Sequence, residues 1–230
     1  MKTFCVIPAF NEAKNITTVI KEAKAVVDRV VVVDDGSTDA TYNLAKAQGV
    51  VCLKHIINRG QGASLRTGTE YCLAEAAEII IHFDADGQYL SRDINRIIKP
   101  IKTGEAEVVY GSRFLPLPDE NEGEAGNKTQ MPFLKRYLLM PLAGAVNRIF
   151  FKINLTDPQS GFRALAASAA RRINWRQDRM AHCSEIMFSV KKNNLRVKEV
   201  PVQVIYRNFG QSFFGGLKIL KDFFIAMIIN

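Results

Sequence analysis

The stretch EIIIHFDADGQ, residues 78–88, joins an apolar run directly to two carboxylates, Asp84 and Asp86. A short run of branched apolar residues is typical of a strand buried on both faces of a parallel sheet. Such sheets bind ligands beyond the carboxyl ends of their strands, so whatever follows each strand is where function is sought. The stretch therefore predicts both the fold class and a first candidate site.

Short apolar runs and amphipathic stretches alternate outward from this point, a pattern that predicts a sheet flanked by helices. The predicted strands of the first half are residues 3–7, 29–33, 50–54, 78–83 and 107–110, and the predicted helices are residues 14–27, 39–48, 63–76 and 91–102. Residues 115–130 contain prolines, glycines and four carboxylates, which predicts a loop. After this loop, helices are predicted at 133–151 and 181–192, and a last strand at 196–206. The sequence thus predicts a single α/β domain with a mostly parallel sheet.

The composition is that of an ordinary globular protein. Of the 230 residues, 47% are hydrophobic and 23% charged, which excludes disordered, collagenous and coiled-coil classes. The four cysteines form no C-x-x-C pair and the three histidines have no ligand spacing, so we expect reduced thiols in a cytoplasmic protein and no zinc site. No apolar stretch reaches the roughly 20 residues that a membrane-spanning helix needs.

Charge is distributed unevenly along the chain, whose formal net charge is +8. Residues 1–126 hold 14 Lys and Arg against 18 Asp and Glu, a net charge of −4, whereas residues 127–222 hold 17 against 5, a net charge of +12. The acidic half suits a metal or polar ligand, and the basic half suits an anionic partner.

The residues after the first two predicted strands are polar. Pro8–Glu12 follows the first strand in place of G-x-G-x-x-G, and no G-x-x-x-x-G-K-[ST] occurs, so dinucleotide and P-loop enzymes are poor interpretations. Asp34 and Asp35 follow the second strand, where carboxylates can accept hydrogen bonds from a ribose or a base. The alternative is that they are solvated turn residues and that Asp39 caps the next helix.

Asp84 and Asp86, two residues apart, supply hard oxygen ligands of the kind that bind Mg²⁺ or Mn²⁺ together with a diphosphate. Such an ion would neutralise the charge that develops on a departing nucleoside diphosphate. The alternative is an Asp-rich turn without a ligand. The glycine-rich stretch at residues 58–63 opens a helix, where it either attracts an anion or forms a simple turn.

In their order, three of these motifs resemble the signature series of family 2 glycosyltransferases: Val6–Glu12, Val33–Thr41 and Asp84–Gln88. Further matches are similar to the branch that contains dolichol-phosphate mannose synthases and their bacterial relatives, and they extend over residues 3 to about 225. These matches are Gly111–Phe114, Asp157–Arg163, Glu199–Val202 and Arg207–Ser212.

The resemblance implies a nucleotide-sugar-binding domain of the GT-A, Rossmann-like type at residues 1–214. It implies GDP-mannose or a UDP-sugar as donor, and a polyprenyl phosphate such as dolichyl or undecaprenyl phosphate as acceptor.

Carried over by position, the resemblance places four residues around the nucleoside: Pro8, Phe10, Glu12 and Asp35. It places three at the Mg²⁺ or Mn²⁺ ion and the donor diphosphate: Asp84, Asp86 and Gln88. Arg113 and Arg207 would contact phosphate groups, and Ser212 would lie in a closing segment near the donor.

The acceptor decides which catalytic groups are needed. A lipid phosphate is already an anion, so it can attack the sugar in one inverting step, aided by arginines and a metal and without a strong base. A saccharide hydroxyl, the alternative acceptor, needs a carboxylate base, for which Glu185 and Asp157 are candidates. We favour a structural role for both, Glu185 as a helix-dipole partner and Asp157 as a turn cap.

The tail at residues 215–230 predicts an amphipathic helix with two lysines beside an apolar face. It suits a membrane interface, which would make the enzyme peripheral on the cytoplasmic face of a membrane, with or without an integral membrane partner. The alternative is a helix that packs on the core or dimerises. A non-catalytic basic module is the other rival, but the basic half shows no nucleic-acid-binding motif, so we expect no nucleic acid partner.

Overall fold

The computed structural model describes residues 1–117 and 155–205 of the chain. The helices predicted at residues 133–151 and 215–230, most of the predicted loop at 115–130, Arg207 and Ser212 lie outside the described residues.

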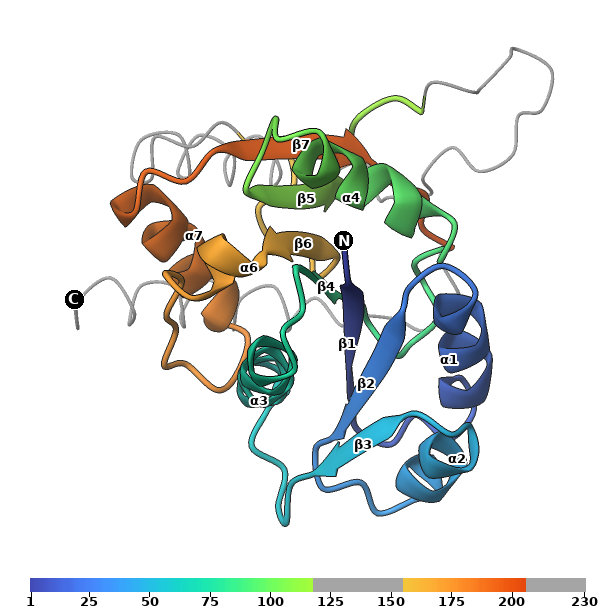
Figure 1. Ribbon diagram of the computed structural model, residues 1–230. Helices are drawn as coiled ribbons and strands as arrows, with labels where there is room; N and C mark the ends of the chain where they lie inside the picture. Colours follow the sequence, from blue (N-terminus) through green and yellow to red (C-terminus); the bar gives the residue numbers. More distant parts are fainter. Residues whose placement is uncertain (118–154, 206–230) are drawn as a thin grey trace, which may run out of the picture.

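The described residues form one seven-stranded sheet with helices on both faces (Figure 1). The strands are β1 Thr3–Ala9, β2 Arg29–Asp34, β3 Val51–Lys54, β4 Ile79–His82, β5 Val108–Ser112, β6 Arg163–Ala166 and β7 Val197–Pro201. The helices are α1 Ile16–Lys24, α2 Thr41–Ala47, α3 Gln61–Ala74, α4 Asp93–Lys102, α6 Ala167–Ala170 and α7 His182–Lys192. The prediction of an α/β domain with a mostly parallel sheet is confirmed.

The strand order is β3-β2-β1-β4-β6-β5-β7, and among these described strands only β6 runs antiparallel to its neighbours, β4 and β5. The strand β6 was not predicted. Its sequence RALA is short and begins with an arginine, yet Arg163 is fully buried between His82 and Tyr110, its partners in register on β4 and β5. A buried arginine hides the apolar pattern by which a strand is identified.

Two apolar cores lie on opposite faces of the sheet because side chains alternate along each strand. In β1, Cys5 and Ile7 face one core, which also contains α1 and α4 residues, whereas Phe4 and Val6 face the other, with α3, α6 and α7 residues. In Figure 1, α1, α2 and α4 lie to the right of the sheet and α3, α6 and α7 to its left. This arrangement leaves the carboxyl ends of β1, β2 and β4 to carry the loops that hold the candidate site.

The helix ends differ slightly from the predictions. Helix α1 is shorter than predicted, and α2 begins at Thr41, whose backbone N–H donates to the carboxylate of Asp39 at 2.9 Å. The predicted strand at 196–206 is β7 followed by an isolated antiparallel bridge between Tyr89 and Val204. Among the described residues, no helix is both long and apolar enough to cross a bilayer.

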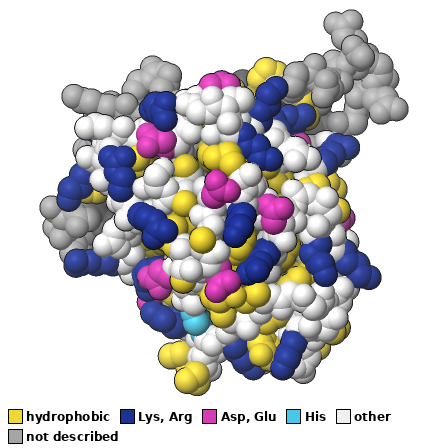
Figure 2. All heavy atoms as spheres, in the orientation of Figure 1, with side chains coloured by type: hydrophobic (Ala, Val, Ile, Leu, Met, Phe, Trp, Pro, Cys, Tyr) yellow, Lys and Arg dark blue, Asp and Glu magenta, His cyan; other side chains and the backbone are white. Residues whose placement is uncertain are grey.

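The face of the molecule in Figure 2 carries Lys and Arg side chains spread between Asp and Glu side chains. On the described part of this face, no continuous basic surface is visible.

Candidate active site

The loops that follow β1 and β2 are tied together at the edge of the sheet. Asn11, with a positive φ of 56°, donates its backbone N–H to Ser37 Oγ at 3.0 Å and accepts the backbone N–H of Thr38 at 2.9 Å. The backbone N–H of Glu12 donates to Thr41 Oγ1 at 2.8 Å. The structure thereby brings the predicted nucleoside residues of the first loop beside those of the second.

The four predicted nucleoside residues differ in exposure. Pro8 is buried within β1, Glu12 is half-buried, and Phe10 is 44% exposed at the rim. Asp35 is buried, and its backbone N–H donates to the Ala9 carbonyl at 2.8 Å, which fixes it next to the end of β1. Phe10 therefore offers the exposed apolar surface of this set.

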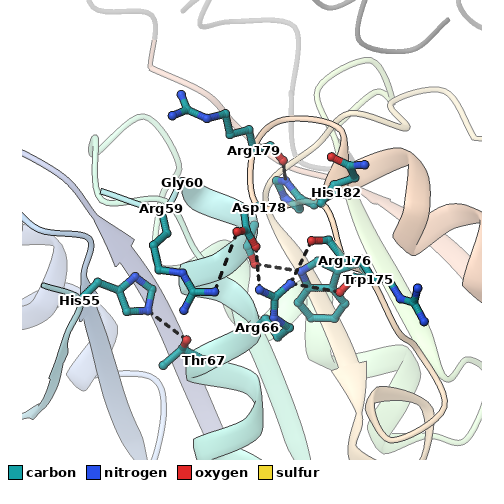
Figure 3. Close-up of polar contacts among 12 residues, drawn as sticks. His55, Arg59, Gly60, Arg66, Thr67, Trp175, Arg176, Asp178, Arg179 and His182 are labelled. Atoms are coloured by element: carbon teal, nitrogen blue, oxygen red, sulfur yellow. Dashed lines mark hydrogen bonds and ion pairs between the residues drawn. The ribbon is translucent and has the colours of Figure 1, made fainter. Parts of the chain in front are cut away.

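The carboxylate of Asp35 organises the loop between β3 and α3. It accepts the backbone N–H groups of Arg59 at 3.0 Å and Gly60 at 2.7 Å, and it lies 2.7 Å from His55 Nδ1. His55 Nε2 lies 3.0 Å from Thr67 Oγ1 on α3, as Figure 3 shows. These bonds fix the position of Asp35 without using all of its acceptor capacity, since a carboxylate offers about four lone-pair sites.

Asp84 is held from two sides at the end of β4. Its Oδ1 accepts Gln61 Nε2, from the first residue of α3, at 2.7 Å. Its Oδ2 lies over Gly161, where an added Cβ would be only 2.5 Å away. The pairing of His82 with Arg163, continued by two residues, places Asp84 opposite Gly161, so the antiparallel β6 supplies the space for this carboxylate.

Asp84 and Asp86 repel one another electrostatically. Burial, and then the negative charge of Asp86, raise the pKa of Asp84 to about 6, and the positive charge of Arg163 opposes the shift. Asp86 Oδ1 accepts the backbone N–H of Gln88 at 2.9 Å, which closes the turn. Two partly buried carboxylates that destabilise each other's charge fit a divalent cation, which would relieve the repulsion.

No group of three or more His, Cys, Asp or Glu side chains is arranged to hold a metal in the described parts of the chain. Two carboxylates are nevertheless the donor set that Mg²⁺ takes when substrate phosphates and water complete its coordination. The residues present therefore fit the predicted metal, with Gln88 beside them on the same turn.

The charge of Asp84 has a cost that can be measured without substrate. A carboxyl whose pKa is higher in the folded than in the unfolded protein lowers the free energy of unfolding. The full loss is present above the folded pKa, and it disappears as the pH falls below the unfolded pKa. We expect metal-free Asp84→Asn to melt at a higher temperature than the unsubstituted protein at pH 7.5, and this difference to shrink as the pH is lowered from 6 towards 4. Thermal melting of both proteins across that range checks this, and an equal melting temperature at every pH would contradict it.

Arg113, predicted to contact phosphate, is held by the buried Asp157. Its Nε and Nη2 donate to the two carboxylate oxygens at 2.6 and 2.7 Å, a bidentate pair. Glu199 on β7 in turn accepts the backbone N–H groups of Thr156 and Asp157 at 2.7 and 2.8 Å. Asp157 is thus a partner of Arg113, and its carboxylate is engaged by that guanidinium.

The glycine-rich stretch serves a packing role in this structure. An added Cβ would lie 2.4 Å from the Asp178 carbonyl oxygen at Gly60 and 2.4 Å from the Gln177 carbonyl oxygen at Gly62. The backbone N–H of Ala63 donates to the Asp178 carbonyl at 3.2 Å. Of the two alternatives left open by the sequence, the turn is therefore the one supported.

Two residues that hold the site were missed from the sequence. Gln61 lies inside the glycine-rich stretch and Gly161 inside the motif Asp157–Arg163, so both were within stretches already singled out. What identifies them is their contact with Asp84, which joins residues 23 and 77 positions apart. A single sequence carries no signal of such contacts.

Comparison with known proteins gives three kinds of match. The profile of the family described as glycosyl transferase family 2 matches residues 4–174. The chain is 38% identical to the uncharacterized protein MJ1222 of Methanocaldococcus jannaschii over 224 residues, 94% of this chain and 88% of that protein. It is 32% identical to the UDP-N-acetylglucosamine–dolichyl-phosphate N-acetylglucosaminyltransferase of Methanococcus voltae, over 91% of this chain and 88% of the relative. It is 26% identical to the polyprenol monophosphomannose synthase of Mycolicibacterium smegmatis, over 97% of this chain and 84% of that relative.

Among solved structures, the glucosyl-3-phosphoglycerate synthase of Mycobacterium tuberculosis in complex with Mg²⁺ and uridine diphosphate is similar with a TM-score of 0.70. The match covers 95% of this chain and 76% of that chain at 18% identity. At that identity the likeness shows the fold, which is the GT-A fold of glycosyltransferases.

Proposed function

The chain belongs to glycosyl transferase family 2, and from this we propose that it is a metal-dependent, inverting glycosyltransferase acting on a polyprenyl phosphate. The donor is a nucleotide sugar, GDP-mannose or a UDP-sugar, and the transferred group is a hexose of the mannose or glucose type. The relatives named above support the acceptor class, since one acts on dolichyl phosphate and another makes polyprenol monophosphomannose.

The observation that carries the proposal is that both carboxylates considered as a base are already engaged. Asp157 is bound at both oxygens by Arg113, and Glu185 accepts the backbone N–H groups of Arg176 and Gln177, each at 2.7 Å. A hydroxyl acceptor needs a carboxylate that can take its proton, whereas a phosphate acceptor does not. The engagement of these two described carboxylates supports an acceptor that is an anion before it reacts.

Each part of the site then has a role in binding and orientation. The end of β1 and the loops after β1 and β2 hold the nucleoside through Pro8, Phe10, Glu12 and Asp35. Asp84, Asp86 and Gln88 would hold the divalent ion, which supplies electrostatic stabilisation of the leaving diphosphate when bound. Arg113, fixed by Asp157, offers its guanidinium to a phosphate group in a defined orientation.

Three further parts of the proposal concern residues outside the described ranges. Arg207 would contact a phosphate group and Ser212 would lie near the donor. The tail at residues 215–230 would rest on the cytoplasmic surface of the membrane where the acceptor lies, alone or with an integral membrane partner. The roles of Arg207 and Ser212 follow from the family motif that they match, and a lipid acceptor, which lies in a membrane, is the physical reason for the role of the tail.

The experiment is a comparison of acceptors with one preparation of the protein. Purified protein is incubated with Mg²⁺ or Mn²⁺, labelled GDP-mannose or UDP-glucose, and either undecaprenyl phosphate or a saccharide. The proposal expects label in the organic phase, dependent on the divalent ion, and little transfer to saccharide. Transfer to the saccharide with none to the lipid would replace it with the alternative function, glycan synthesis on a hydroxyl acceptor.

A further inference from the structure

The segment Trp175–Arg179, between α6 and α7, lies across the first turn of α3 (Figure 3). Trp175 Nε1 donates to the Gly62 carbonyl at 2.9 Å, and the backbone N–H of Ala63 donates to the Asp178 carbonyl at 3.2 Å. Because Gly60 and Gly62 have no side chains, the carbonyl oxygens of Asp178 and Gln177 approach this turn closely. A displacement of the segment must therefore displace the turn.

Arg66 ties the segment to α3 itself. Its Nη2 donates to Asp178 Oδ1 at 2.6 Å, and its Nη1 lies within hydrogen-bond distance of the Trp175 and Arg176 carbonyl oxygens at 3.2 and 3.3 Å. In Figure 3 the guanidinium points into the segment from the body of the helix. One side chain thus engages three residues of the segment.

Glu185, in the first turn of α7, holds the segment from the other helix. Its Oε2 alone accepts the backbone N–H groups of both Arg176 and Gln177, each at 2.7 Å. Hydrogen bonds to a charged acceptor are about twice as strong as neutral ones. The segment is therefore fixed between a carboxylate on α7 and a guanidinium on α3.

The turn at residues 59–61, against which the segment packs, also binds the carboxylates of Asp35 and Asp84. The backbone N–H groups of Arg59 and Gly60 donate to Asp35, and the side chain of Gln61 donates to Asp84 at 2.7 Å. Residues 59–61 consequently contact the 175–179 segment on one side and the predicted donor site on the other.

We propose that Glu185 is a positioning residue for the donor site, acting through the 175–179 segment and residues 59–61 on Asp35 and Asp84. Its relevance to a nucleotide-sugar donor rests on the proposed function. The mechanical linkage is a property of the fold, so it can be measured on the protein without any substrate.

A positioning role and a catalytic-base role predict different results for two substitutions of Glu185. Glutamine keeps a carbonyl oxygen that can accept both N–H groups at Glu185, whereas alanine removes the acceptor. A positioning role is therefore rescued by Glu185→Gln and lost in Glu185→Ala. A base role is lost in both variants, because an amide cannot take the proton.

The test is amide hydrogen exchange of the full chain in the absence of substrate, followed by titration with uridine and guanosine diphosphates in the presence of Mn²⁺. Glu185→Ala removes the charged acceptor of the Arg176 and Gln177 amides. The exchange protection of the Arg59 and Gly60 amides, which bind Asp35, should then fall by about tenfold or more, the effect typical of losing hydrogen bonds to a charged group. The Kd of the diphosphate that binds should rise, and Glu185→Gln should restore both. Glu70→Ala, at an exposed position on α3, is the matched control.

Unchanged protection at Arg59 and Gly60 in folded Glu185→Ala would overturn the proposal, whatever happens to activity. If Glu185→Ala does not fold, Arg66→Lys, which loses the forked contacts on the other side of the segment, must show the same loss of protection. A linkage seen by exchange in a protein that binds neither diphosphate would instead refute the proposed function and leave the linkage intact.

Discussion

Asp86→Ala is expected to lower glycosyl transfer by at least about 100-fold, the loss typical when one group that stabilises developing charge is removed. The physical reason is the pairing of Asp86 with Asp84: burial, and then the negative charge of Asp86, raise the pKa of Asp84 to about 6, so a cation shared by the two carboxylates would be stabilising. With one carboxylate removed, a single aspartate remains to hold the ion, whose other coordination positions are filled by substrate phosphates and water. Transfer rates and Mn²⁺ binding, followed by electron paramagnetic resonance with nucleoside diphosphate present, measure the effect.

The control is Glu22→Ala, which removes an exposed carboxylate from α1 on the surface of the protein. It should leave both the rate and Mn²⁺ binding unchanged. Wild-type Mn²⁺ affinity in folded Asp86→Ala would show that the two aspartates are an acidic turn, the alternative that the sequence left open.

Gly161→Ala is expected to be almost as damaging, although Gly161 carries no functional group. The added methyl would lie 2.5 Å from Asp84 Oδ2 and 3.0 Å from Oδ1, so the carboxylate must move. A displacement of about 1 Å at a positioned group can cost roughly 100-fold in rate. We expect weakened Mn²⁺ and nucleotide binding together with loss of transfer.

Gly104→Ala separates this effect from ordinary glycine strain. Gly104 has a φ of +75° and no atoms within 4 Å of an added Cβ, so its replacement should lower stability and leave nucleotide binding intact. Melting temperatures and nucleotide affinities of the two variants provide the comparison. If Gly161→Ala bound Mn²⁺ as tightly as the parent, Asp84 would not be a ligand in the position described.

The local parts of the site were predictable from sequence for a physical reason. A buried strand followed by polar residues is visible in any single chain, so Asp84 and Asp35 could be placed at strand ends before the structure was known. In the structure, β2 and β4 lie on either side of β1 and both run parallel to it. The carboxyl ends of β2 and β4, with Asp35 and Asp84, therefore lie at the same edge of the sheet.

The contacts between distant segments were not predictable. Arg113 meets Asp157 across 44 positions, and Gln61 meets Asp84 across 23. The contact of Arg113 with Asp157 depends on β6 pairing antiparallel with β5, and that strand is hidden by its first residue, Arg163. Asp157 and Glu185 were candidate bases for which a structural role was favoured, but the hydrogen-bond partners that engage them could not be named from the sequence.

The central claim is that the sugar is joined to a phosphate oxygen of the lipid. The most direct measurement is phosphorus magnetic resonance of undecaprenyl phosphate during reaction with the donor that the protein binds, in the presence of Mg²⁺. The proposed function predicts that the phosphate monoester signal of the lipid is replaced by that of a phosphodiester as nucleoside diphosphate is released. A monoester signal that persists while sugar is transferred to a hydroxyl would contradict it.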